Sequence, residues 1–132
     1  MNPAPNAYLY AMLGSALGGG LRLYLSTLVA RGFGTEFPWG TLAVNLLGCF
    51  LVGLLGALFA PIGRVHVMPL TWVFLVVGVL GGFTTFSAFS LEALLLAQRG
   101  APMAATAYVA ASVVGCLATA AAGYAIAVAA TR

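Results

Sequence analysis

Apolar residues form four long segments separated by short polar turns. Each segment exceeds the roughly 20 residues that a helix needs to cross a bilayer. The pattern predicts membrane-spanning helices over residues 7–30, 39–60, 69–98 and 102–131. Prolines lie in the first turn of the last three segments, where a missing backbone N–H does little harm. The N-terminus lacks the basic residues of a signal peptide, so we expect the first segment to be retained as a helix.

The composition places the chain among integral membrane proteins. Its 132 residues are 63% hydrophobic and only 5% charged, and the mean hydropathy is +1.10. No soluble domain of this size has such a composition. The net charge of +3 is small and scattered, which argues against a nucleic-acid partner. The fold class expected is an all-α, four-helix membrane protein with residues 1–132 in a single domain.

Polar residues interrupt the third segment at its middle, between Gly81 and Ser90. This stretch contains two glycines, four hydroxyl residues and three phenylalanines. Backbone N–H and C=O groups must be satisfied internally in lipid, so a break is tolerated only where protein or water covers it. Breaks of this kind usually form ion sites in transport proteins, because exposed helix ends carry partial charges. We expect the glycines to let the chain turn here.

Other polar and aromatic residues at membrane depth are candidates for an ion pathway. Asn45 lies near the middle of the second segment, with Thr41 one turn earlier on the same face. Its amide could serve an ion, or it could hold two helices together. Phe86 and Phe89 are three residues apart and therefore share a helical face. The positive edge of a phenyl ring could contact an anion, although most membrane phenylalanines face lipid or core.

A stripe of small polar residues follows one face of the last segment. Tyr108, Ser112 and Cys116 are spaced by four residues, and Thr119 lies slightly off the line. The stripe could form a wet track for an ion or a surface for close helix packing. Cys116 and Cys49 both lie in apolar segments, and we interpret them as small packing residues rather than as a disulfide or a metal site.

Two charged residues lie inside the apolar segments. Arg22 could reach the interface or attract anions into a vestibule. Glu92 is the one acidic residue within a segment. It could pair with Arg22, accept a hydrogen bond from a hydroxyl, or extend to the aqueous boundary.

Arginines are balanced across the two sides of the predicted bundle. Arg31 and Arg99 fall on one side, and Arg64 and Arg132 fall on the other. Membrane orientation normally follows an excess of basic residues on one side, and such an excess is almost absent here. Either an external factor orients the chain, or the chain inserts both ways and pairs as an antiparallel dimer.

Three motifs together resemble those of the CrcB/Fluc family of fluoride channels. They are residues 81–90 followed by Glu92, residues 40–48, and residues 18–22. The resemblance extends over essentially the whole chain in length, segment number and motif order. It implies a channel, not an enzyme, for passive fluoride efflux across the bacterial inner membrane. It also implies a multi-pass, dual-topology homodimer with antiparallel subunits and two pores.

The resemblance also implies specific sites. Asn45, Phe86, Phe89, Tyr108 and Ser112 match its anion pathway, and the nearby hydroxyls of Thr41 and Thr85 are expected to contribute. A structural sodium ion at the dimer axis would be bound by the backbone carbonyls of Gly81 and Thr84. Arg22 and Glu92 are the charges expected in the vestibule. Cys116 replaces a hydroxyl on the track and Ala88 replaces a frequent threonine, so the roles of Cys116 and Thr119 stay open.

Two other functions compete with fluoride transport. A proton-coupled small multidrug exporter also has four spans and dual topology, but it needs a carboxylate in the middle of its first span. The first segment has none, and Arg22 carries the opposite charge. A structural subunit would explain the glycine-rich segments. It would not explain why a break, a phenylalanine pair and Asn45 occur together.

Overall fold

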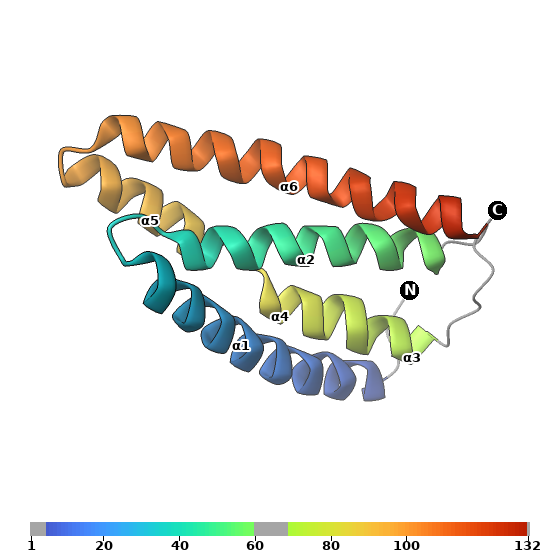
Figure 1. Cartoon of the computed structure of the whole chain (residues 1–132). Coiled ribbons are helices and arrows are strands. Elements are labelled where there is room, and N and C mark those ends of the chain that lie inside the picture. The colour runs from blue at the N-terminus through green and yellow to red at the C-terminus, as the bar shows by residue number, and fades with distance from the viewer. Residues whose placement is uncertain (1–4, 60–68, 132) are drawn as a thin grey trace.

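The computed structural model describes residues 5–59 and 69–131, which fold as helices joined by short turns (Figure 1). Three continuous helices are α1 (Pro5–Phe33), α2 (Trp39–Leu58) and α6 (Pro102–Ala130). The segment between α2 and α6 is divided into α3 (Pro69–Trp72), η1 (Val73–Leu80), α4 (Gly81–Phe83) and α5 (Phe86–Gln98). The four apolar segments of the sequence are therefore helical.

Two glycines in the left-handed region allow the turns at one end of the bundle. Gly34 follows α1 with a φ of 82°, and Gly100 follows α5 with a φ of 79°. A residue with a Cβ is strained in this conformation, whereas glycine adopts it freely and so ends a helix. Both turns lie at the same end, opposite the start of α1 and the end of α6 (Figure 1). Arg31 and Arg99 therefore share one end of the bundle, as their positions in the sequence predict.

The third segment is broken over two residues only. α4 ends at Phe83, and Thr84 and Thr85 are extended with ψ angles of 154° and 118°. The helix resumes at Phe86, where the Thr85 side chain caps α5 by accepting a hydrogen bond from the Ala88 N–H at 3.2 Å. A hydroxyl at this position replaces a missing helical acceptor. The interruption is shorter than the ten-residue polar stretch suggests.

The expectation that the glycines turn the chain is wrong. Gly81 is helical, with φ −64° and ψ −36°, and Gly82 lies in the same helix α4. Gly82 is instead required by close packing, because a Cβ there would lie 2.6 Å from the carbonyl oxygen of Ser15. The threonines make the break, since Thr85 can supply the cap that a restarted helix needs.

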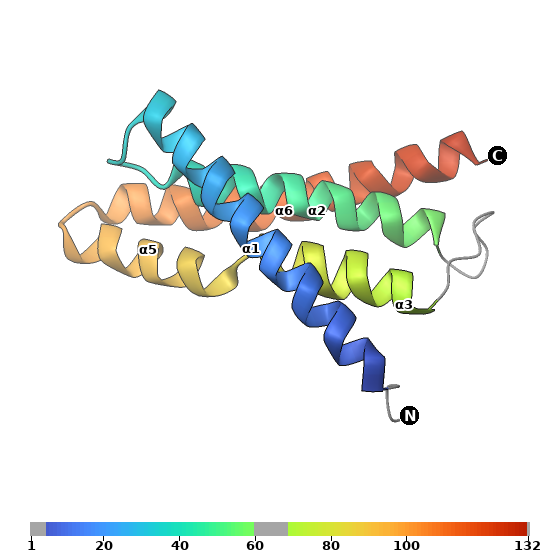
Figure 2. The ribbon, with the colours of Figure 1, turned by 90° about the horizontal axis from the view of Figure 1, so that it is seen from below.

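Helix α1 crosses the third segment obliquely (Figure 2) and packs closely on η1 and α4. Gly14 and Gly18 are buried in this contact. A Cβ at Gly14 would meet the Phe74 carbonyl, and one at Gly18 would meet the Val79 carbonyl. Two small residues spaced by four therefore let the helix backbones approach closely here. Part of the segment packed here, η1, is a π-helix, a form that often occurs near functional sites.

Helices α2 and α6 run side by side and in the same direction along most of their length (Figures 1 and 2). Glycines again permit the approach. A Cβ at Gly53 would meet the carbonyl oxygen of Ala120, and a Cβ at Gly123 would meet that of Phe50. Without a hydrophobic force between helices in lipid, such close backbone contact is a principal source of association.

Within the described residues, three helical segments are long and apolar enough to cross a membrane. They are Trp39–Leu58, Pro69–Gln98 and Pro102–Ala130. Helix α1 has 29 residues, but its glycines and Arg22 make it less apolar. The chain is thus a multi-pass membrane protein built from helices.

The contact between α2 and α6 can be tested with a matched pair of glycines on one helix. We expect Gly53→Ala to destabilise the protein by about 1–3 kcal/mol, because its methyl group would clash with the α6 backbone. The control is Gly56→Ala, where nothing lies within 4 Å of the added Cβ. The measurement is the thermal midpoint of the detergent-solubilised protein. Equal midpoints for the two variants would contradict the proposed packing.

Candidate functional site

The side chain of Asn45 bridges the break in the third segment. Its Oδ1 accepts a hydrogen bond from the Thr85 N–H at 2.9 Å, and its Nδ2 donates to the Thr85 carbonyl at 3.1 Å. One amide therefore pairs the Thr85 N–H, which the break takes out of the helix, and adds a second donor to the Thr85 carbonyl, which as the N-cap carbonyl also accepts the first bond of α5. This geometry corresponds to the interpretation of Asn45 as a link between helices. The same side chain also lines a cavity, so the two interpretations are compatible.

The break takes the usual helical donors from the carbonyls at the end of α4, those of Gly81 and Thr84 among them. In a continuous α-helix the carbonyl of Gly81 would accept from the Thr85 N–H, and that of Thr84 from the Ala88 N–H. The Thr85 N–H instead donates to Asn45, and the Ala88 N–H donates to the Thr85 hydroxyl. These are two carbonyls for which the family resemblance implies a cation. Such carbonyls are hard oxygen ligands at the negative end of a helix.

Phe86 and Phe89 lie beside each other at the start of α5, directly after the break. Their ring centroids are 5.3 Å apart with an interplanar angle of 50°. Phe89 is 8% exposed and also contacts the Tyr108 ring at 5.3 Å, whereas Phe86 is 77% exposed. One ring therefore belongs to the core of the single chain, and the other is left open on its surface.

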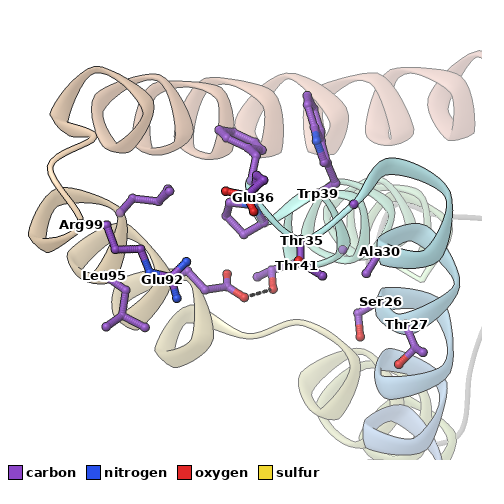
Figure 3. Close-up of a pocket in the computed structure, with 15 residues that line it drawn as sticks. Ser26, Thr27, Ala30, Thr35, Glu36, Trp39, Thr41, Glu92, Leu95 and Arg99 are labelled. Atoms are coloured by element: carbon purple, nitrogen blue, oxygen red, sulfur yellow. Dashed lines mark hydrogen bonds between the residues drawn. The ribbon is translucent and has the colours of Figure 1, made fainter.

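Glu92 accepts hydrogen bonds from two hydroxyls on different helices. The Thr41 hydroxyl donates to Oε1 at 2.7 Å (Figure 3), and the Tyr108 hydroxyl donates to Oε2 at 2.7 Å. Of the three alternatives considered for Glu92, the structure shows hydrogen bonds from hydroxyl groups. A hydroxyl has only one proton to donate. Thr41 and Tyr108 thus direct theirs to the carboxylate in this conformation, and an anion would have to compete with it.

Arg22 and Glu92 line one large cavity of about 710 Å³, together with Thr41, Thr85 and Ser87. The two charged groups form no ion pair in the part of the chain that is described. Toward the end of the bundle, a second cavity of about 350 Å³ is lined by Glu92 and Arg99, among others (Figure 3). Charges of both signs therefore border the polar side of the break.

A third cavity of about 260 Å³ lies on the other side of the break. Uncharged side chains line it: Asn45, Cys49, Thr84, Thr85, Phe86, Phe89, Ser112, Val113 and Cys116. The Ser112 hydroxyl is buried, and it has no hydrogen-bond partner among the described residues. A buried polar group of this kind is costly to leave without a hydrogen-bond partner, so Ser112 offers a free donor to whatever enters the cavity. This cavity, which we call the phenylalanine cavity, brings together the break, the phenylalanine pair and the α6 stripe.

The comparisons with known proteins bear on this geometry. The family model described as "CrcB-like protein, Camphor Resistance (CrcB)" matches residues 9–124. The chain is 47% identical over 116 residues to the Fluoride-specific ion channel FluC 2 of Bradyrhizobium diazoefficiens, covering 88% of this chain and 85% of that protein. It is 50% identical over 111 residues to the Fluoride-specific ion channel FluC of Rhodospirillum rubrum, covering 83% and 85%. This chain belongs to the CrcB family.

The predicted site residues of this CrcB-family chain fall into two groups. Asn45, Thr85, Phe86, Phe89 and Ser112 meet at the phenylalanine cavity. Thr41 and Tyr108 meet at Glu92, and the Tyr108 ring also contacts the Phe89 ring.

Sequence analysis missed two features of this arrangement. One is the convergence of two hydroxyls on Glu92, and the other is the position of Cys49 on the cavity wall. The i, i+4 relation of Cys49 to Asn45 could have indicated the second, because both fall on one face of α2. Thr119 is not among the residues of the cavity wall, and its hydroxyl donates to the Cys116 carbonyl of its own helix.

The bridge between Asn45 and the break is testable through stability. We expect Asn45→Ala to lower stability by about 1–3 kcal/mol, because the Thr85 N–H would lose its partner at membrane depth and the Thr85 carbonyl would lose one of its donors. Thr106→Ala is the control, since the exposed Thr106 hydroxyl bonds only its own helix. Thermal unfolding in detergent measures both, and a loss in Asn45→Ala no larger than in the control would refute the bridge.

Proposed function

We propose that this chain is a fluoride-selective ion channel for passive fluoride efflux across the bacterial inner membrane. The observation that carries the proposal is the buried Ser112 hydroxyl, unpaired among the described residues, on the wall of an uncharged cavity beside Phe86 and Phe89. The names of its relatives, Fluoride-specific ion channel, point the same way. A channel needs no carboxylate or nucleophile, because each ion passes unchanged.

Fluoride is small and strongly hydrated, so a selective path must replace its water with donors placed on the wall. Ser112 can donate its hydroxyl proton, and Asn45 has a second N–H besides the one given to Thr85. The positive edges of Phe86 and Phe89 add weak contacts. No cationic side chain lines this cavity, so an ion can leave as readily as it enters.

Apart from Thr85, the remaining predicted residues lie outside the phenylalanine cavity, where an ion would pass before it enters that cavity. Arg22 raises the local concentration of anions in the cavity that it shares with Glu92. Thr41 and Tyr108 each donate a hydrogen bond to the Glu92 carboxylate. Either hydroxyl can donate to an anion only after its bond to Glu92 breaks. Thr85 caps α5 and lines both cavities.

We further propose that α1 is a fourth membrane span and that two chains assemble as an antiparallel homodimer with two pores. At ~1.5 Å per residue, the 29 residues of α1 exceed the thickness of the bilayer core. The balanced arginines favour insertion in both directions. Phe86 and Gly81 are exposed on the single chain although they flank the break, and a second copy would cover them.

The family resemblance implies a structural sodium ion, and the donor set at the break fits one. The Gly81 and Thr84 carbonyls have lost their helical donors, and two chains together would offer four such oxygens. Bound sodium would supply positive charge that links the two breaks. The residues described here that hold those carbonyls in place are Asn45 and Thr85.

The channel function can be tested in liposomes that contain the purified protein. We expect rapid fluoride efflux, detected with a fluoride electrode when an ionophore balances the charge, and far slower chloride efflux under the same gradient. The physical reason is that small neutral donors replace the water of fluoride more completely than that of the larger chloride ion. Fluoride flux no greater than chloride flux would refute the proposal.

The contribution of Ser112 can be separated from stability. We expect Ser112→Ala to reduce fluoride flux by about tenfold or more, because the free donor at the phenylalanine cavity is lost. Its thermal midpoint should not fall, because the hydroxyl has no described partner to lose. Thr119→Ala is the control on the same helix, and its flux should match that of the unmodified protein. Undiminished flux in Ser112→Ala would remove this hydroxyl from the pathway.

A further inference from the structure

The two cysteines of the chain lie on α2 and α6, which pack side by side. Cys49 lies on α2 and Cys116 on α6, and both are free thiols. Neighbouring contacts fix the register of the two helices. Leu46 meets Gly115 on one side of the thiols, and Gly53 meets Ala120 on the other. The cysteines are therefore level with each other along the two helices, and both line the same cavity.

Both thiols lie on the wall of the phenylalanine cavity. Cys49 is one helical turn from Asn45, and Cys116 is one turn from Ser112; all four residues line the cavity. Each cysteine is half-buried, unlike a thiol sealed in a core. The pair thus forms a patch of two sulfur atoms beside the polar groups that the proposed pathway uses.

Thiols are poorly suited to fluoride and well suited to a different kind of ion. A thiol is a weak hydrogen-bond donor, so it serves a hard, strongly hydrated anion less well than a hydroxyl does. Soft thiolates instead favour soft metal ions. Linear coordination by two sulfur ligands is common for d10 ions such as Hg(II). Within the part of the chain that the structure describes, no cationic side chain lines the cavity to repel a metal cation.

We propose that Cys49 and Cys116 form a two-thiolate site for one soft d10 cation, and that the bound cation inhibits the channel. Binding of Hg(II) breaks two S–H bonds, releases two protons to water and forms two S–Hg bonds, with no change of oxidation state. The product has no net charge, so its burial carries little electrostatic penalty. Because protons compete with the metal, affinity should fall as the pH is lowered.

Inhibition follows from the position of the site and rests on the function proposed above. The metal and its two sulfur atoms would occupy the cavity wall one turn from Asn45 and Ser112. There the anion has to exchange water for protein donors. Metal binding itself does not depend on that function, so the two parts of the proposal can be measured separately.

Binding is tested with the purified full chain and mercuric acetate. We expect one Hg(II) per chain after desalting, with both thiols protected from a maleimide. The chain contains two cysteines, so no other thiol contributes. Cys49→Ser and Cys116→Ser each leave a single thiol as a matched control. The second sulfur binds intramolecularly, so the unmodified chain should hold the metal more tightly than either single-cysteine variant. Removing the metal from the unmodified chain should need a concentration of competing monothiol about tenfold higher or more. Equal release from all three proteins would show two independent thiols and overturn the site.

Inhibition is tested in the same proteoliposomes, with each variant compared with its own untreated flux. We expect mercuric acetate to reduce fluoride efflux of the unmodified chain by about tenfold, and a strong competing thiol to restore it. The double variant Cys49→Ser/Cys116→Ser should be unaffected. Stable two-thiol binding without loss of flux would overturn the inhibition. Absent fluoride flux before treatment would refute the channel function, while the binding measurement would still decide the site.

Discussion

The arrangement of this membrane protein depends on how the backbone groups at one helix break are hydrogen-bonded. Thr84 and Thr85 are extended at the middle of a long apolar segment, where lipid offers no partner for an N–H or a carbonyl. The Asn45 amide bonds both groups of Thr85, and the Thr85 hydroxyl caps the helix that follows. These bonds release the carbonyls of Gly81 and Thr84 from helical pairing. The same interaction therefore stabilises the break and leaves carbonyl oxygens there without their helical donors.

The close packing of glycine-rich helices gives that break its surroundings. Gly14, Gly18 and Gly82 bring α1 against η1 and α4, and Gly48 allows α2 to approach Thr84 and Phe83. With the backbones this near, side chains of α2, α5 and α6 meet around a small space. Helix association in lipid depends on such contacts, because burial from water provides no force between helices there.

The two sides of the break differ in chemistry. On one side, Glu92 holds the hydroxyls of Thr41 and Tyr108 and shares a cavity with Arg22. On the other, an uncharged wall combines an unpaired hydroxyl at Ser112 with phenyl rings and two thiols. A charged approach that leads to a neutral passage suits an ion that must be attracted without being trapped. The thiols add sensitivity to soft metals at the same place.

Hydropathy and motifs alone predicted the helical class, the four apolar segments, the family and a break in the third segment, because a bilayer imposes strong length and polarity constraints on a sequence. Periodicity also placed Phe86 beside Phe89. Sequence could not show that Gly81 and Gly82 stay helical, that Glu92 accepts from two hydroxyls, or that Cys49 and Cys116 line the same cavity. Each of these depends on the register between helices distant in sequence. That register is set by where glycines let two backbones approach, so only the tertiary structure decides it.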